Sequence, residues 1–411
     1  MTEKIDIQKL SNGMTIIGSE MPDVASAAFD FFLPAGAAII PKGFCGAAAV
    51  IKDWMFRGAG ENSSKQLLDK IDGLGLHRGE KVNAKHLIIG SALEAGNTAQ
   101  ALELYADIIT KPTLDPKQFE FSKQLAIAEL MGLEDDPRQK TLLQLRQNFY
   151  PDPLGRSPLG VMEELQSLSA EKCKEAVLQN FNISETIFAI AGKYDFDAVC
   201  TQIEKLFGEQ KPKKQIPLAH KEYLPNYAHT HYDGAQVHIG IMCPTEPAQG
   251  PDYYNARVAI AVLSGGMSSR LFTEVREKRA LCYAVGASYN CLKEMAGLSC
   301  YAGTTPGKSQ ETYEVIISEL EKLSQGITTE ELKRAKAGLK SALVMQSESS
   351  SARSINAAAD YYMLGRVRGL EEIKEKIEAV TIESVYNFLK NNPFQNFTVV
   401  TIGPEKLNLS Q

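Results

Sequence analysis

The two halves of the sequence repeat one order of elements, and this repetition limits the folds open to the chain. Strand-like runs open each half, at residues 14–17 and 27–33 in the first and 237–242 in the second. An apolar strand, a helix, a second long helix and a closing β-branched strand then follow in the same order. Strands and helices are mixed rather than strictly alternating. The pattern therefore predicts an α+β fold of two duplicated domains, each a mostly antiparallel sheet covered by helices.

The repeat also predicts where the domains begin and end. A helix at 98–109 corresponds to one at 309–323, and the turns that begin at Thr113 and Thr328 each open the next helix. The halves close with strands at 186–192 and 397–403. Between them, residues 208–217 concentrate lysine, glutamine and proline, which is typical of a linker. We expect domains at 1–207 and 229–411, joined by a linker at 208–228.

Composition excludes several classes of protein. The chain of 411 residues carries 50 acidic and 44 basic side chains without a basic stripe, which gives no footprint for nucleic acid. The longest apolar stretch, residues 25–40, is broken by Asp30 and Pro34, so no membrane span is expected. The 7 cysteines form no C-x-x-C pair, which indicates free thiols and a cytoplasmic protein. A periplasmic location is the alternative if a signal segment was removed before Met1.

Clusters that could carry chemistry are few. His229 and His231 share one strand face near His238 and could share a metal, but polar strand residues are the favoured interpretation because no acidic or cysteine cluster completes a site. The acidic run 134–136 could hold a divalent cation, although an acidic helix end before a proline is favoured. Neither a Ser-His-Asp set, nor a P-loop, nor a dinucleotide fingerprint is found.

Two longer segments are more informative. The first is a helix that runs into a glycine turn, Gly46-Ala-Ala-Ala-Val-Ile-Lys-Asp-Trp-Met-Phe-Arg-Gly58; the second, residues 263–285, contains Ser269-Arg-Leu-Phe272 and Tyr283. Together they resemble the insulinase/pitrilysin-type zinc peptidases, which include the mitochondrial processing peptidase and small bacterial two-chain enzymes. The resemblance covers nearly the whole chain. It implies that the two domains form half of a clam-shaped chamber.

The resemblance also implies that the zinc motif has been lost. In that family the first helix carries H-x-x-E-H, whose positions fall here on Ala49, Lys52 and Asp53, while the third ligand falls on Glu129. Because a hydrolytic zinc site needs about three protein ligands, we expect no metal and no cofactor in this chain. An ion pair from Lys52 to Glu129 or Asp53 is predicted to fill the position. A weak two-carboxylate cation site at Asp53 and Glu129 is the alternative.

The second segment keeps the family's other functional pair. Arg276 and Tyr283 match the residues that, in the family, reach from the zinc-free half and hydrogen-bond the substrate backbone beside the metal. Their spacing fits two helical turns or a passage from helix to strand. The alternative is that Arg276 pairs with Glu274 or Glu277 on a helix surface and that Tyr283 is ordinary strand filler.

The resemblance therefore predicts a zinc-free, substrate-handling subunit of a heterodimeric metallopeptidase, inactive alone. Its partners would be a homologous zinc-bearing subunit and an extended peptide, which could add a strand to a sheet edge. The family's Asn-Ala edge signature is replaced by Gly79-Glu80, and only Gly265-Gly266 remains of a glycine-rich loop. A purely structural scaffold is the alternative function, and an unrelated enzyme that reuses the chamber is a second one.

Overall fold

The computed structural model describes residues 4–179, 181–213, 218 and 222–409. Helices account for 47% and strands for 21% of the chain, which confirms the mixed α+β class. The chain divides into two compact units, which are considered one at a time. Unit 1 comprises residues 1–132, 152–220 and 346–367, and unit 2 comprises residues 133–151, 221–345 and 368–411.

The sheet of unit 1 has six strands in the order β1-β2-β8-β3-β7-β6. Their bounds are β1 (Ile5–Lys9), β2 (Thr15–Glu20), β3 (Ser26–Leu33), β6 (His77–Val82), β7 (Leu87–Glu94) and β8 (Ile187–Gly192). All neighbours are antiparallel except β2 and β8, which run parallel. A short hairpin of β4 (Gly58–Ala59) and β5 (Asn62–Ser63) stands apart. The predicted mostly antiparallel sheet is therefore confirmed for this unit.

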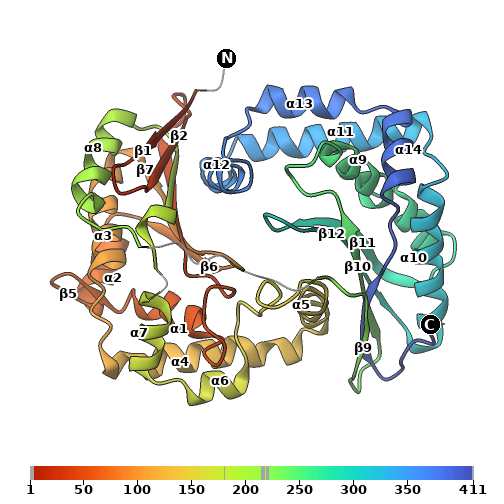
Figure 1. Ribbon diagram of the computed structural model, residues 1–411, viewed down its shortest axis with the longest axis horizontal. Coiled ribbons are helices and arrows are strands. Elements are labelled where there is room, and N and C mark those ends of the chain that lie inside the picture. The colour runs from red at the N-terminus through yellow and green to blue at the C-terminus, as the bar shows by residue number, and fades with distance from the viewer. Residues whose placement is uncertain (1–3, 180, 214–217, 219–221, 410–411) are drawn as a thin grey trace. The chain divides into compact units, whose positions relative to one another are not determined.

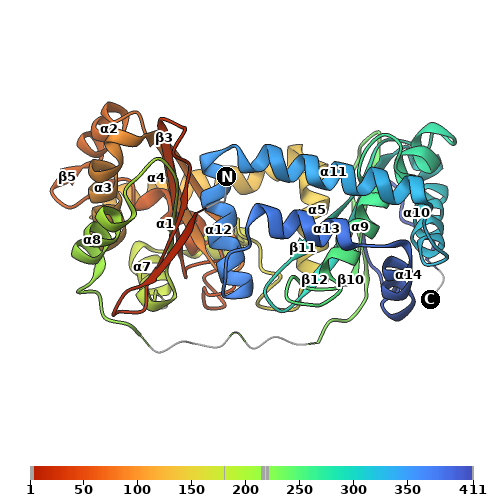
Figure 2. The ribbon, with the colours of Figure 1, turned by 90° about the horizontal axis from the view of Figure 1, so that it is seen from above.

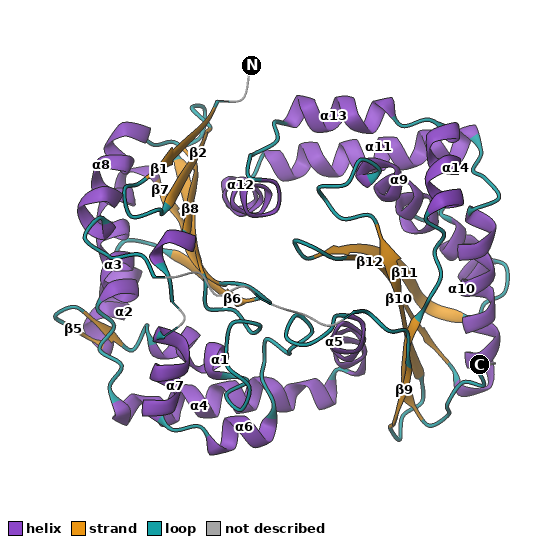
Figure 3. Cartoon of the chain, viewed as in Figure 1, coloured by secondary structure: helices purple, strands orange, loops and turns teal. Residues whose placement is uncertain are grey.

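The sheet of unit 2 repeats this plan with five strands in the order β11-β12-β10-β13-β9 (Figure 3). The strands are β9 (Tyr227–His231), β10 (Val237–Thr245), β11 (Cys282–Cys291), β12 (Ala296–Thr304) and β13 (Thr398–Gly403). Only β9 and β13 run parallel. In both sheets the parallel pair joins an early strand of the half to its closing strand. This shared position confirms the duplication predicted from the sequence.

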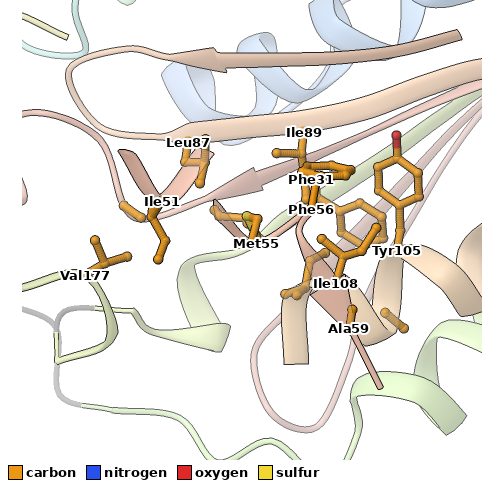
Figure 4. Packing of buried hydrophobic residues seen from close by; sticks show 14 of the residues in the cluster. Phe31, Ile51, Met55, Phe56, Ala59, Leu87, Ile89, Tyr105, Ile108 and Val177 are labelled. Carbon is orange, nitrogen blue, oxygen red and sulfur yellow. The ribbon is translucent and has the colours of Figure 1, made fainter. Parts of the chain in front are cut away.

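Helices cover one face of the unit 1 sheet and enclose its main core. They are α1 (Ala47–Trp54), α2 (Ser64–Gly73), α3 (Thr98–Thr110), α4 (Pro116–Met131), α6 (Met162–Ser167), α7 (Ala170–Leu178) and α8 (Phe196–Phe207), with short 3₁₀ turns η1 (Ala95–Asn97) and η3 (Ile183–Glu185). Phe31 from β3 and Tyr105 from α3 are buried at the centre of this core, with Phe56 packed beside them (Figure 4). Asp115 caps α4 and Pro116 occupies its first turn, as the sequence predicted.

Unit 2 builds its core in the same way. Its helices are α9 (Tyr253–Ser264), the π-helix η4 (Phe272–Glu277), α10 (Ser309–Leu323), α11 (Thr329–Ser347), α13 (Leu370–Ala379) and α14 (Ile382–Asn391), with η2 (Gly132–Asp135) and η5 (Pro306–Lys308) as short turns. Strand residues such as Ile239 and Ile241 are buried against Leu263 and Leu320. Thr328 and Glu331 form the predicted cap at the start of α11, because each side chain accepts a hydrogen bond from the other residue's amide.

One helix of each sequence half packs on the sheet of the other half. Helix α5 (Pro137–Phe149) precedes the linker but contacts β10 and β13 of unit 2, and α12 (Ser350–Leu364) lies in the second half but contacts β8, β3 and β2 of unit 1 (Figures 1 and 2). Ala357 and Ala358 of α12 are buried against Phe32 and Ile187. Each sheet thereby gains apolar cover on the face that its own half leaves bare.

This exchange changes the predicted division of the chain. The units follow the boundaries 1–207 and 229–411 except at α5 and α12, because burial of a sheet face does not require a helix that is local in sequence. Strand β9 begins at Tyr227, inside the predicted linker 208–228, of which residues 214–217 and 219–221 lie outside the described residues. All seven cysteines are free thiols. Among the described residues no helix is both long and apolar enough to cross a membrane.

Candidate functional site

Arg276 and Tyr283 lie together in unit 2. Arg276 is on the π-helix η4, and Tyr283 is the second residue of β11, so the spacing corresponds to a passage from helix to strand. The guanidinium carbon of Arg276 lies 4.7 Å from the ring centroid of Phe272 and 5.2 Å from that of Tyr283. The side chain of Tyr283 is 81% exposed. The Arg276 cation therefore lies beside one exposed and one half-buried aromatic ring, at the surface of unit 2 and outside its core.

The backbone between these two residues is irregular at three points. A π-helix is rare and is frequent at functional sites. Ala280, between the pair, has a φ of 47°, which is uncommon for a residue with a side chain. The pairing of β11 with β12 then shifts between Cys282 and Ala284, so Tyr283 is the extra residue of a β-bulge. Such irregularities are tolerated where the surrounding structure holds them in place.

The bulge explains why Tyr283 points away from the core. In a regular strand, alternate side chains share a face, so Cys282 and Val285 would lie on opposite faces. The extra residue lets both of them pack against the core of unit 2, together with Tyr289. Tyr283 is thereby left unpaired in register and exposed. Its exposure is a consequence of backbone geometry, because bulges re-aim a side chain at a sheet edge.

The structure gives only weak support to the alternative that Arg276 pairs with Glu274 or Glu277 on a helix surface. Glu274 accepts hydrogen bonds from Lys278 and Arg279, each at 2.7 Å, and these bonds lower the pKa of its carboxyl. Glu274 is therefore engaged by other cations. The Nε atom of Arg276 lies 3.8 Å from Glu277 Oε1, which is too far for a hydrogen bond. A surface ion pair does not account for the position of this side chain.

A second arginine fixes the start of the π-helix, and the sequence analysis did not single it out. Arg270 donates to both carboxylate oxygens of Glu331, at 2.7 and 2.9 Å, and to the carbonyl of Gly326 at 2.8 Å. The pair is largely buried, and hydrogen bonds from Arg270 are the main cause of the lowered pKa of Glu331. This two-pronged contact joins the loop before η4 to the capped end of α11. Its signal in the sequence was the Ser269-Arg-Leu-Phe272 motif.

The positions of the lost zinc motif lie in unit 1, on α1 and α4. Ala49 is buried and offers no ligand atom. The Nζ atom of Lys52 lies 3.0 Å from Glu129 Oε2, which confirms the predicted ion pair with that carboxylate. Asp53 instead contacts Arg57 Nε and the hydroxyl of Ser122, both at 2.5 Å. Glu129 therefore pairs with Lys52, whereas Asp53 pairs with Arg57 and Ser122. The sequence analysis did not single out Arg57 or Ser122 as partners of Asp53.

Glu80 of the edge strand β6 extends this charged cluster. Burial raises the pKa of its carboxyl, while Arg78 and Lys52 oppose that rise. Within the described residues, no group of three or more histidine, cysteine, aspartate or glutamate side chains is placed to hold a metal ion. An ammonium group beside Glu129 and an alanine at a ligand position do not fit zinc. The ion pair of Lys52 with Glu129 joins α1 to α4, and Glu80 pairs with Arg78 within β6.

The three histidines of the second half have three different partners. His229 Nδ1 lies 2.9 Å from Thr401 Oγ1, His231 Nε2 lies 3.0 Å from Asp233 Oδ1, and His238 Nδ1 lies 2.7 Å from the Tyr301 hydroxyl. Burial lowers the pKa of both His229 and His238. This geometry favours the interpretation of polar strand residues.

Known proteins share both the sequence pattern and the duplicated α+β fold of this chain. The chain matches the family model described as the peptidase M16 inactive domain at residues 167–339. It is 27% identical over 411 residues to an uncharacterized zinc protease of Rickettsia felis, covering 99% of both chains. It is 24% identical to an uncharacterized zinc protease of Bacillus subtilis, covering 96% of this chain and 97% of that protein.

Solved structures share the fold at lower identity. A peptidase M16 inactive domain from Pseudomonas fluorescens has a TM-score of 0.85 at 17% identity and 99% coverage of both chains. A protease from Helicobacter pylori has a TM-score of 0.89 at 18% identity, covering 98% of this chain and 100% of that one. A chain of complex III2 from Candida albicans has a TM-score of 0.86 at 20% identity, covering 98% and 96%. These matches confirm the resemblance to zinc peptidases, and the inactive domain is typical of a non-catalytic, peptidase-like subunit.

Proposed function

We propose that this chain is the non-zinc-binding, substrate-handling subunit of a heterodimeric zinc metallopeptidase that acts on extended peptides, and that it supplies Arg276 and Tyr283 to the partner's active site. The observation that carries the proposal is the contact of Arg276, on a π-helix, with the exposed Tyr283 at a β-bulge. The ion pair of Lys52 with Glu129 supports the other half of the proposal, because the catalytic metal must then come from another chain.

The chemistry of the pair suits a peptide carbonyl. A tyrosine hydroxyl donates one hydrogen bond, and a guanidinium donates up to five from a rigid fork. Donors aimed in advance at an oxygen that becomes negative stabilise the transition state of acyl transfer more than the ground state. The ring of Tyr283 and the guanidinium of Arg276 are in contact, so both donors would reach the same peptide bond. The partner's zinc would supply the activated water.

The alternative is a scaffold without a catalytic part. The fold shared with a chain of the Candida albicans complex is compatible with it, since a shared fold does not specify an activity. The retained pair argues against this alternative, because a purely structural role does not require an exposed tyrosine in contact with an arginine.

Reconstitution tests the proposal. This chain, a zinc-bearing homologue with an H-x-x-E-H helix, and their mixture would each be examined by size-exclusion chromatography and with a quenched peptide substrate. We expect a stable heterodimer and chelator-sensitive cleavage by the mixture alone. Chelator-sensitive cleavage by this chain alone would contradict the proposal, and so would normal turnover by a mixture that lacks both Arg276 and Tyr283 side chains.

A further inference from the structure

We propose that a cavity of unit 2 binds a carboxylate that carries a short aliphatic group. The cavity lies between the turn that follows α9 and the first two turns of α11, and its volume is about 160 Å³. A free acid and the C-terminal residue of a peptide both present this chemistry, and the test below separates them. The inference goes beyond the proposed function, because neither Arg276 nor Tyr283 lines the cavity and no partner chain is needed to fill it.

Three segments of unit 2 form the cavity. They are Ala261 and Val262 of α9, residues 265–269 of the turn, and Glu331, Arg334 and Ala335 of α11. Gly265 keeps the turn close to α9, since a Cβ there would lie 2.4 Å from the carbonyl oxygen of Ala261. On the α11 side, a Cβ on Gly338 would lie 3.7 Å from the carbonyl oxygen of Gly265. The turn is thus packed between two helices, and the space left beside it is similar to a cavity of about 150 Å³ that holds benzene.

One wall of the cavity is apolar. Val262 and Ala335 are buried in the core of unit 2, and Ala261 packs against that core. Met267, on the turn, has a side chain that is 80% exposed. A methionine is flexible and polarisable, so it can fold over an apolar group that enters the cavity. Burial of a short aliphatic chain against this wall would be favourable, because it removes apolar surface from water.

The turn offers hydrogen-bond donors from its backbone. The described residues provide no acceptor for the amides of Gly266, Met267 and Ser268. The amides on either side, of Gly265 and Ser269, donate to backbone carbonyls at 2.6 and 3.0 Å. Three successive amides are therefore available to a ligand. Successive amides in a turn are typical of sites that bind anions, and such sites capture the carboxylate of a peptide C-terminus.

Arg334 supplies a positive charge at the cavity. Its side chain is exposed and forms no hydrogen bond or ion pair with another residue that the structure describes. Glu331 is the acidic residue of the lining, but its carboxylate already accepts hydrogen bonds from Arg270 and from the amide of Thr328. Glu331 therefore does not compete for Arg334. A guanidinium can bind a carboxylate through two parallel hydrogen bonds, and the apolar wall accounts for an aliphatic group attached to that carboxylate.

Ligand-observed NMR titrations of this chain alone test the inference. The two acids are isovalerate and an N-acetylated tetrapeptide that ends in valine with a free carboxylate. Their uncharged controls are isovaleramide and the same peptide with a C-terminal amide. We expect millimolar binding, as is usual for so small a ligand. The amides should bind at least about tenfold more weakly, because only a carboxylate accepts charge-assisted hydrogen bonds from the site.

The two acids also identify the source of the carboxylate. Binding of the peptide acid identifies the C-terminal residue of a peptide as the ligand. Binding of isovalerate without binding of the peptide identifies a free acid, because the mouth of the cavity then excludes a longer chain. Both results support the proposed chemistry.

Protein variants check the location. Arg334→Gln removes the guanidinium from the cavity, whereas Lys333→Gln removes a positive charge from the preceding exposed residue of α11, which does not line it. We expect Arg334→Gln to weaken binding of isovalerate about tenfold and Lys333→Gln to change it less than about twofold. Ala261→Leu fills part of the cavity and should also weaken binding. Thermal unfolding without ligand checks that each variant folds.

Several results would overturn the inference. They are equal binding of acids and amides, equal effects of the Arg334 and Lys333 substitutions, and absence of binding by either acid. Inorganic phosphate is the competing anion, and tighter binding of phosphate than of isovalerate would show that the ligand class is wrong. Failure of this site is read from the NMR titrations of the isolated chain, whereas failure of the proposed function is read from turnover of the reconstituted pair.

Discussion

The guanidinium carbon of Arg276 lies 5.2 Å from the ring centroid of Tyr283, although a turn through Ala280 separates the helix from the strand. A cation–π contact at an exposed site contributes about 0.5–1 kcal/mol. Because the two side chains are in contact, the effects of substituting them are not expected to add.

The hydroxyl of Tyr283 is the group to remove first. Tyr283→Phe keeps the ring on which Arg276 rests and deletes a single donor. Loss of one such donor costs about 10²–10³ in kcat, so we expect a decrease of that size in the reconstituted heterodimer. Tyr386→Phe is the matched control, because Tyr386 is also exposed but lies on α14. Turnover within twofold of wild type for Tyr283→Phe, at matched assembly, would mean that the pair is structural.

Zinc is expected not to bind stoichiometrically to the isolated chain. The Lys52 ammonium lies 3.0 Å from Glu129, where a cation would have to displace it, and Asp53 is held by Arg57. Elemental analysis of protein stripped of metal, re-exposed to zinc and desalted checks this. About one zinc per chain would contradict the prediction. If Asp53→Asn and Glu129→Gln then abolished that binding, the two-carboxylate alternative would be correct.

Asp30 makes the stability of unit 1 depend on pH. It lies half-buried on β3, and burial raises the pKa of its carboxyl to about 6, although a hydrogen bond with Ser354 of α12 opposes the rise. The folded state therefore holds this proton more tightly than the unfolded state. Stability from Asp30 is full below about pH 4, where both states are protonated, and it declines as the pH rises to about 6.

The substitution Asp30→Asn removes that titration. We expect the variant to gain about 2 kcal/mol relative to wild type between pH 4 and pH 7, measured as the difference in unfolding free energy from urea titrations. Asp69→Asn on the exposed face of α2 is the control for the loss of a surface carboxylate. A difference between Asp30→Asn and wild type that stays constant across this range would contradict the assigned cause.

The Arg270–Glu331 pair is expected to position η4. Both side chains are largely buried, so each alanine variant leaves a charge without its partner and should destabilise unit 2. A double-mutant cycle by urea unfolding should give a coupling energy of about 1–3 kcal/mol. Glu331 has a lowered pKa, so this contribution is present above its unfolded pKa and is lost as the pH falls.

A positioning role also requires an effect on catalysis. In the reconstituted enzyme, Arg270→Lys should lower kcat more than it raises KM, because the lysine keeps the charge but not the two-pronged contact that sets the π-helix. A variant that unfolds more easily but turns over normally at low temperature would limit Arg270 to a structural role.

The sequence by itself determined the duplicated order of elements, the mixed fold class and the caps of α4 and α11. These features depend on the periodicity of apolar residues and on hydrogen bonds between residues close in the chain. Both can be recognised in the sequence of a short segment. The resemblance of two motifs led to Lys52, Glu129, Arg276 and Tyr283. The predicted ion pair of Lys52 with Glu129 followed, because a partly buried ammonium is stabilised by a carboxylate within reach.

The tertiary structure decided what depends on distant segments. Helices α5 and α12 pack on sheets outside their own halves, since the burial of apolar surface has no direction along the chain. Asp53 pairs with Arg57, four residues along the chain, and accepts a hydrogen bond from Ser122, which only the packing of α1 on α4 could bring near it. The bulge at Tyr283 is where the register of β11 on β12 shifts, and this shift brings Cys282 and Val285 to the same core. A sequence names the residues of such a site, but register and packing decide which of them reach the surface together.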